Sequence, residues 1–210
     1  MIYVPLGADD PIRQGDIFQS VPRVRVPLSH LAVLREDGTF EATWTQASGG
    51  EGVVRAVLPL EPVWAIVITQ NCDATRNEEI SLCEIKPFAE VEPRAAGGTI
   101  KARVAAITRQ AKVNYKWFYL PPDPTLGLDQ KMAVDFRCTM RLPRPELETH
   151  RHLRRGRLYD DAYDHFRERL AHFFRRYAYD EWYPLDREEM DFYADKCPEQ
   201  VARYPWQREE

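Results

Sequence analysis

The feature that most constrains this chain is a pair of apolar runs separated by a short polar segment. The first run, Val63 to Thr69, is strongly β-branched and predicts a central strand buried on both faces. The second run, Ile80 to Ile85, is expected to pair back with it across a turn that contains Asn77. The segment at the end of the first run is polar or small throughout, and we call it the knot: Thr69, Gln70, Asn71, Cys72 and Asp73. A tight hairpin needs only about two such residues, so the surplus indicates recognition.

The knot is therefore predicted to be a ligand-binding site at the end of a central strand. We expect Gln70 and Asp73 to be accessible in a concave surface and Cys72 to be mostly buried. Two alternatives stay open. In one, the knot is only the end of a hairpin, where Asn71 and Asp73 bond their own backbone and Cys72 is a small buried hydrophobe. In the other, Cys72 is a nucleophile, although no histidine lies near it in sequence to serve as its base.

Periodicity along the rest of the chain predicts an α+β protein. Besides the two runs, strands are expected at residues 15–18 with an extension to 28, 31–34, 40–45, 53–58, 116–120 and 132–140. Asp37-Gly38 is a hairpin signal between two of these strands. Helices are expected at residues 99–113, 160–177 and 186–194. The apolar face of the second helix, with Phe166, Leu170 and Phe173, should be buried against the sheet.

Composition gives no sign of a membrane or exported protein. The 210 residues carry a net charge of −4 and are 44% hydrophobic, which is ordinary for one domain or one domain with an appended element. No run approaches the roughly 18 apolar residues of a membrane helix, and the first ten residues lack the features of a signal peptide. Cysteines 72, 83, 138 and 197 are not in paired spacings, so we expect reduced thiols and a cytoplasmic location.

Net charge gives no reason to expect nucleic acid, but the basic residues are unevenly distributed. Residues 94–116 hold six basic side chains and no acidic one, and they run into the aromatic residues of 115–119. Cations beside aromatic rings suit single-stranded nucleic acid. The alternative is a strand whose aromatic side chains face the core while its lysines are solvated. The predicted RNA contacts from this stretch are Lys101, Arg109, Lys112 and Lys116.

A second basic stretch, residues 141–157, contains six arginines. We expect it to bind phosphate, or to dock the acidic C-terminal segment of this chain or of a partner. Its predicted contact residues are Arg154, Arg155 and Arg157.

The histidines and cysteines do not form a recognisable metal motif. Structural zinc sites usually show ligands in close pairs, and these cysteines are scattered. His165 and His172 share a helix face, but seven residues at the helical rise place them about 10 Å apart. We therefore expect no metal and no cofactor.

The order of the motifs resembles the PemK/MazF toxin family. Gly15 to Phe18 matches the opening Gly-Asp-Ile strand of that family, and Pro62 to Thr69 matches its next, β-branched strand. Ile80 to Phe88 stands in place of the strand that ends in Pro-Ile-Thr, and Ala133 to Thr139 in place of a late strand with Val-Asp. Arg155 to Leu158 then matches the Gly-Arg-Leu that precedes the closing helix. The resemblance covers about two thirds of the chain.

This resemblance implies a fold but not the ribonuclease activity of the family. The implied fold is a small SH3-like antiparallel β-barrel over residues 1–158, with an inserted helix near 99–113 and a helical extension, 159–210, packed on the barrel. The family has a catalytic arginine before its proline, where this chain has Glu61. Where the family has Pro-Ile-Thr with a catalytic threonine or serine, this chain has Lys86, Pro87 and Phe88. Fold alone does not license function.

The sequence therefore predicts a non-catalytic binding module of a bacterial toxin–antitoxin or phage-conflict system. Its expected partners are single-stranded RNA or a protein, and a homodimer is compatible with this hypothesis. One alternative is a divergent endoribonuclease, with Asp73, Lys86, Arg109 or Arg137 as catalytic candidates. The other is a scaffold or assembly subunit whose acidic C-terminal segment contacts a neighbour.

Overall fold

The computed structural model describes residues 2–7, 9–35, 38–49, 53–93, 99–113, 115–175 and 187–198. Contacts divide the chain into two compact units, residues 1–173 and 174–210. In the second unit the structure describes α7 (Arg187–Lys196), where a helix is predicted. Arg109 and Lys112 lie on a described helical backbone, but their side chains are outside the described part of the chain.

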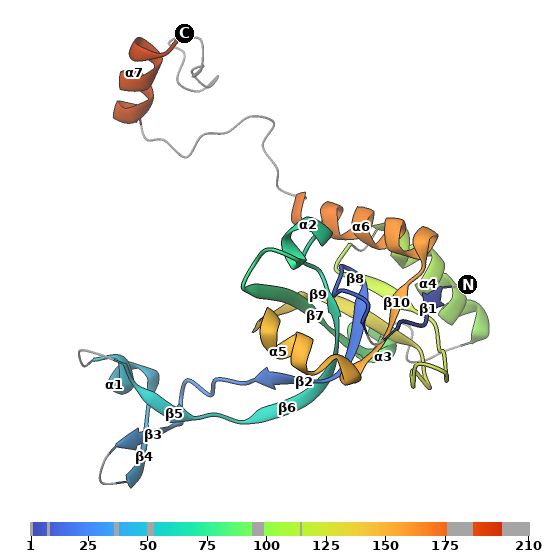
Figure 1. Ribbon diagram of the computed structural model, residues 1–210, viewed down its shortest axis with the longest axis horizontal. Helices are drawn as coiled ribbons and strands as arrows, with labels where there is room; N and C mark the ends of the chain where they lie inside the picture. The colour runs from blue at the N-terminus through green and yellow to red at the C-terminus, as the bar shows by residue number, and fades with distance from the viewer. Residues whose placement is uncertain are drawn as a thin grey trace. The chain divides into compact units, whose positions relative to one another are not determined.

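The first unit is built on a seven-stranded antiparallel sheet (Figure 1). In sheet order its strands are β1 (Tyr3–Val4), β10 (Arg154–Leu158), β2 (Asp16–Val24), β6 (Leu60–Val67), β7 (Glu79–Pro87), β9 (Met132–Pro143) and β8 (Trp117–Leu120). The predicted α+β class and the central position of β6 are confirmed. The order is linear with β1 and β8 at its edges, so the described strands form no closed barrel.

A second, three-stranded sheet is inserted between β2 and β6. Its order is β4 (Gly38–Ala42), β3 (Leu31–Arg35) and β5 (Arg55–Val57), as the hairpin signal predicts. The strand predicted over residues 40–45 ends at Ala42, because α1 (Trp44–Ser48) begins there. Thr43 and Gln46 form a capping box at its start, in which each side chain accepts from the backbone N–H of the other.

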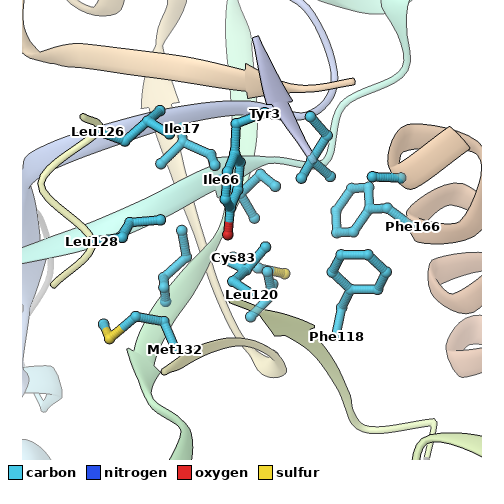
Figure 2. Packing of buried hydrophobic residues seen from close by; sticks show 14 of the residues in the cluster. Tyr3, Ile17, Ile66, Cys83, Phe118, Leu120, Leu126, Leu128, Met132 and Phe166 are labelled. Carbon is cyan, nitrogen blue, oxygen red and sulfur yellow. The ribbon is translucent and has the colours of Figure 1, made fainter. Parts of the chain in front are cut away.

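One face of the seven-stranded sheet packs against α6 (Asp160–Arg175), as Figure 2 shows for the core around Phe166. The ring of Phe166 lies 5.4 Å from that of Phe118 and 5.8 Å from that of Phe136, measured between centroids. Phe166 and Leu170 are buried as predicted, and Phe173 is partly buried against the same cluster. The sheet contributes alternate residues of its central strands, among them Ile66 of β6.

The opposite face of the sheet carries two separate apolar clusters. Leu147 of α5 (Arg144–Thr149) packs with Ala65 and Leu82 in the first cluster. In the second, α3 (Phe88–Val91) packs on Trp117 and Ala133, with Ile107 of α4 (Ile100–Val113) against it. The stretch of β7 and β9 between these clusters carries charged residues, which are described below.

The pairing of β7 with β9 contains an irregularity that reverses the direction of side chains. Ile85 lies opposite Val134, and Cys83 lies opposite Thr139. The interval from 83 to 85 on β7 therefore corresponds to the longer interval from 134 to 139 on β9. Side chains alternate between the two faces along a strand. The paired positions are two residues apart on β7 and five residues apart on β9, so the alternation on β9 changes phase relative to that on β7. Cys138 consequently faces the same side as residues 84 and 86 of β7.

Asp16 is a fully buried carboxylate that joins three parts of the chain. Its Oδ2 accepts from Nη1 of Arg154 at 3.1 Å and from the backbone N–H of Arg13 at 3.1 Å. Its Oδ1 accepts from Nε of Arg157. The two arginines also donate to the carbonyls of Gly7 and Pro11. Asp16 therefore fixes β2, β10 and the segment before β2 to one another.

Replacing Asp16 by asparagine is expected to destabilise the protein by about 3–5 kcal/mol, because it leaves buried arginine charge uncompensated. Chemical denaturation of Asp16→Asn measures this loss. Asp129→Asn, at an exposed position, is the matched control and should change the free energy of unfolding by less than about 0.5 kcal/mol. A loss for Asp16→Asn as small as that of the control would contradict the role of this carboxylate.

Candidate functional site

The knot forms one wall of an open hollow of about 700 Å³. Residues 71–74 form a single helical turn, α2 (Asn71–Ala74), instead of a simple hairpin end. Gln70 and Asp73 are exposed and line the hollow together with Thr69, as predicted. The other polar lining comes from residues that follow α2 and from β9: Asn77, Glu78, Glu79, Ser81 and Arg141.

Two knot residues do not line this hollow. Asn71 has a structural role, because its Oδ1 accepts from the backbone N–H of Gln14 at 2.9 Å and its Nδ2 donates to the Tyr163 hydroxyl at 3.1 Å. The prediction that Cys72 is mostly buried is wrong, since Cys72 is exposed. The single turn of α2 directs it outward, and its thiol lies 3.6 Å from Oδ1 of Asp73. The expectation of a small buried hydrophobe assumed a simple hairpin end, whereas a helical turn stands in the connection between the paired strands β6 and β7.

Asn71→Ala and Asp73→Ala should separate structural from binding roles in the knot. Asn71→Ala loses two hydrogen bonds and is expected to cost about 1–3 kcal/mol of unfolding free energy. Asp73→Ala changes an exposed residue and should keep the melting temperature of the wild type while removing function in cells. Thermal melts and an in-cell assay of both variants test this. A fully active Asp73→Ala protein would show that the knot is only a structural turn.

The predicted RNA contacts whose side chains the structure describes come from three parts of the fold. Arg154, Arg155 and Arg157 lie on β10, Lys116 immediately precedes β8, and Lys101 lies on α4. The Arg154 side chain is only 2% exposed, because it serves the buried Asp16. Arg155 is exposed and donates to the carbonyl of Leu126. Lys116 is exposed, as is Lys101 on α4.

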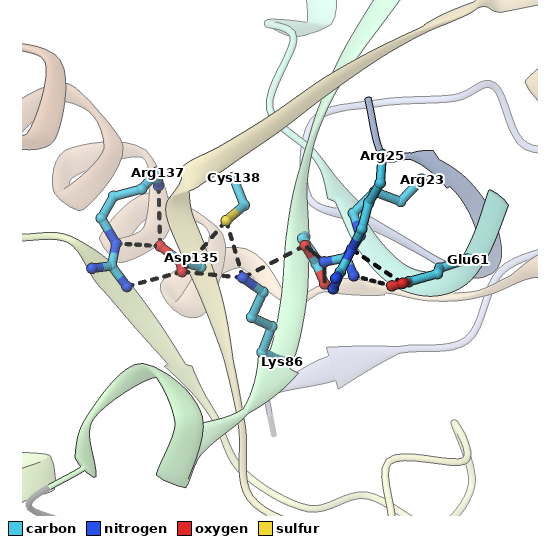
Figure 3. Close-up of polar contacts among 8 residues, drawn as sticks. Arg23, Arg25, Glu61, Lys86, Asp135, Arg137 and Cys138 are labelled. Atoms are coloured by element: carbon cyan, nitrogen blue, oxygen red, sulfur yellow. Dashed lines mark hydrogen bonds and ion pairs between the residues drawn. The ribbon is translucent and has the colours of Figure 1, made fainter. Parts of the chain in front are cut away.

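A linked set of charged side chains lies on β2, β6, β7 and β9, with Arg25 just beyond the end of β2. Figure 3 shows these residues linked one to the next across the sheet. We call the seven charged members the charged row: Arg23, Arg25, Glu61, Glu84, Lys86, Asp135 and Arg137.

The links of the charged row begin on β2 and end on β9. Glu61 accepts from both Arg23 and Arg25, and Arg23 also bonds Glu84 at 2.5 Å. Nζ of Lys86 lies 3.6 Å from a carboxylate oxygen of Glu84 and 3.6 Å from Oδ2 of Asp135.

Two further contacts complete the β9 end of the charged row. Arg137 holds Asp135 with two side-chain hydrogen bonds, at 2.8 and 3.0 Å. The thiol of Cys138 lies beside the row, 3.0 Å from Nζ of Lys86.

The cations of the charged row are more accessible than two of the carboxylates that hold them. The side chains of Arg25 and Arg137 are 62% and 48% exposed, whereas those of Glu84 and Asp135 are 6% and 4% exposed. Lys86 is intermediate. Buried carboxylates need paired partners, so Glu84 and Asp135 fix the positions of Lys86 and Arg137, whose outer atoms remain in solvent. Arg25 is held instead by Glu61, which is 41% exposed.

The pKa values of three members of the row, Lys86, Asp135 and Arg137, are shifted in the direction that keeps each group charged. Burial alone would raise the pKa of Asp135, but the hydrogen bonds from Arg137 outweigh burial and hold it below its usual value. Burial alone would lower the pKa of Lys86, but its hydrogen bond with Cys138 and the carboxylates of Glu84 and Asp135 raise it. The pKa of Arg137 is raised by Asp135. Each of these effects keeps the group charged around neutral pH.

The sequence contains a pattern that indicates the charged row, although none of the motifs considered above includes it. Charged residues stand two positions apart in β7 (Glu84 with Lys86), in β9 (Asp135 with Arg137) and at the end of β2 (Arg23 with Arg25, one residue beyond the strand). Residues two apart in a strand share a face, so each pair presents two charges on one side of the sheet. Lys86 and Arg137 are predicted only as catalytic candidates of the ribonuclease alternative, and the structure places both on the carboxylate of Asp135.

Comparisons with known proteins do not assign the chain to a family. No protein-family model matches the chain, and no curated protein matches it either. Within the described residues, no helix is long and apolar enough to cross a membrane. The same residues contain no group of three or more His, Cys, Asp or Glu side chains arranged to hold a metal ion.

The depressed pKa of Asp135 predicts a pH-dependent contribution to stability. A carboxylate with a lowered folded pKa stabilises the fold above its unfolded pKa of about 3.9, and this contribution disappears as pH falls through the folded pKa. Asp135→Asn should therefore cost about 1–3 kcal/mol at neutral pH, and the difference from wild type should shrink below about pH 4. Urea denaturation over a pH series measures it. A difference that is independent of pH would contradict this linkage.

Proposed function

We propose that the protein is a non-catalytic binding module whose charged row holds the phosphate backbone of single-stranded RNA. The observation that carries this proposal is the placement of Lys86 and Arg137 over the buried carboxylates Glu84 and Asp135, with exposed Arg25 held by Glu61 at the other end of the row. Cations held in place by buried partners lose little conformational freedom on binding. Guanidinium and ammonium groups are also the usual ligands of phosphate oxygens.

The pKa directions favour binding over catalysis at this site. Cleavage of RNA through its 2′-hydroxyl needs a base that exchanges protons near neutral pH. Asp135 is held ionised with a lowered pKa, which makes it a weak base, and Lys86 and Arg137 are held protonated. These groups supply a constant electrostatic surface.

The cellular setting of the proposal, a bacterial toxin–antitoxin or phage-conflict system, rests on the resemblance to PemK/MazF toxins. The antiparallel strands followed by the packed helix α6 agree with that resemblance in order. Lys86 stands in the segment that replaces the Pro-Ile-Thr of the family, so the charged row occupies the part of the chain where the family has catalytic residues. We propose an SH3-like relationship on this basis.

A divergent endoribonuclease is the second candidate function. One observation favours it: Lys86 and Arg137, both named as catalytic candidates, meet at a single carboxylate, Asp135. Such a cluster resembles the cationic stabilisation that phosphodiester cleavage needs. Cleavage of an oligoribonucleotide by the purified protein, lost in Lys86→Gln, would favour this candidate over the binding module.

Salt dependence of RNA binding tests the main proposal. Three accessible cations should give a slope of log K against log salt of about −2, since each contact to a single strand contributes about −0.7. Fluorescence anisotropy with a short labelled oligoribonucleotide over a salt series measures this slope. Arg25→Gln, Lys86→Gln and Arg137→Gln should each reduce the slope by about one contact, with folding checked by thermal melts.

Arg167→Gln is the matched control for this experiment. Arg167 is an exposed arginine of α6 that pairs with Asp164, outside the charged row and the knot hollow. Its replacement should leave both affinity and slope unchanged. Absence of RNA binding by the wild type at low salt would overturn the proposal. Binding of an acidic peptide instead of RNA would assign the row to a protein partner.

A further inference from the structure

We propose that oxidation by a peroxide joins Lys86 and Cys138 through a covalent sulfur–nitrogen bond between β7 and β9. The two reacting atoms are already in contact, with Nζ of Lys86 3.0 Å from Sγ of Cys138 (Figure 3). Oδ2 of Asp135 lies 3.6 Å from each of them. The proposal is a modification site that goes beyond RNA binding.

The geometry holds an amine and a thiol together where a small oxidant reaches both. Lys86 and Cys138 are each partly exposed, whereas the carboxylates of Glu84 and Asp135 that position the ammonium are buried. The strand irregularity described above turns Cys138 toward the face that carries Lys86. An isolated surface thiol has no amine within reach, so the contact between Lys86 and Cys138 distinguishes this site from an ordinary exposed cysteine.

The reaction has two balanced steps. In the first, Cys138 attacks one oxygen of hydrogen peroxide, which gives a sulfenic acid and one water, with sulfur oxidised by two electrons and peroxide reduced. In the second, the neutral amine of Lys86 attacks that sulfur. The hydroxyl group leaves with one proton of the amine as water, and a sulfenamide remains. Overall the protein loses two hydrogen atoms, and peroxide becomes two molecules of water.

The protonation state of Lys86 controls the second step. The groups that face its ammonium are Glu84 on its own strand and Asp135 and Cys138 on β9. They hold the lysine pKa above its usual value, so only a small fraction of the amine is neutral at pH 7. We expect the yield of cross-link to rise between pH 7 and pH 9.

A disulfide with Cys83 is the competing product, and the structure disfavours it. Cys83 is fully buried in the core beneath α6, and burial raises the pKa of its thiol to about 12. The strand irregularity places Cys138 on the opposite face of the sheet. The lysine amine is in contact with the sulfur, whereas no hydrogen bond links the two cysteines among the described contacts.

The cross-link would also change the charged row. It removes the positive charge of Lys86 and adds a covalent tie across β7 and β9. If the proposed function holds, oxidised protein should bind single-stranded RNA with lower affinity and with a salt slope reduced by about one contact. This consequence rests on the proposed function, whereas the cross-link itself does not.

Mass spectrometry of the whole protein after oxidation tests the inference. Reduced protein is treated with hydrogen peroxide, alkylated and digested with trypsin without reductant. Trypsin does not cleave before Pro87, so the cross-link joins peptides 77–94 and 138–141. The expected joined species is lighter than the sum of its two peptides by two hydrogen atoms, and a thiol reductant should release it. Oxidation of Cys138 to sulfinic acid with no joined peptide would overturn the proposal.

Matched variants identify the bond, because a disulfide between Cys83 and Cys138 would join the same two peptides. Cys83→Ala should keep the joined peptides, whereas Lys86→Arg should lose them, since a guanidinium is always protonated. Cys72→Ser, which removes a more exposed thiol beside Asp73, should leave the cross-link intact. Loss of the joined species in Cys83→Ala, or its survival in Lys86→Arg, would overturn the lysine assignment. These readouts contain no RNA, so they stand apart from the outcome of the binding experiment.

Discussion

The fold of the first unit depends on one buried carboxylate, that of Asp16. A carboxylate with no solvent exposure is stable only when its charge is compensated, and Arg154 and Arg157 provide this compensation. Because those arginines also hold the carbonyls of Gly7 and Pro11, the same interaction positions the segment before β2. It further fixes β10, from which the chain passes directly into α6. The seven-stranded sheet and the helix that covers it are thus aligned through a single charge.

The two faces of the seven-stranded sheet are covered to different extents. One face is covered by α6 and forms a continuous apolar core. Within the described residues, the other face is covered by α5 at one end and by α3 and α4 at the other, and no described helix covers its centre. Charged side chains fill this centre, but the close packing of strands still buries the inner carboxylates Glu84 and Asp135. Each buried anion needs cations beside it, and Lys86 and Arg137, which meet this need, keep their outer atoms in solvent.

The elements that follow from a local pattern of apolar residues were predicted from the sequence. The β-branched run that ends at Thr69 gave β6, and the apolar face with Phe166 and Leu170 gave α6. β10 was missed because Arg154 to Leu158 carries no apolar alternation. Two of the three arginines predicted to meet RNA there, Arg154 and Arg157, serve the buried Asp16 instead.

The candidate site was only partly predictable. Gln70 and Asp73 belong to one contiguous segment, so their accessibility could be inferred. The charged row draws its members from four strands, and the strand order that brings them together is a tertiary property.

The strand irregularity between residues 134 and 139 constrains which insertions and deletions this part of β9 tolerates. Losing or gaining one residue there would exchange every later side chain of β9 between interior and exterior, turning Met140 and Leu142 away from their cluster. Length at this point of the gene is therefore under the same constraint as residue identity, and we expect natural variation here to be by substitution.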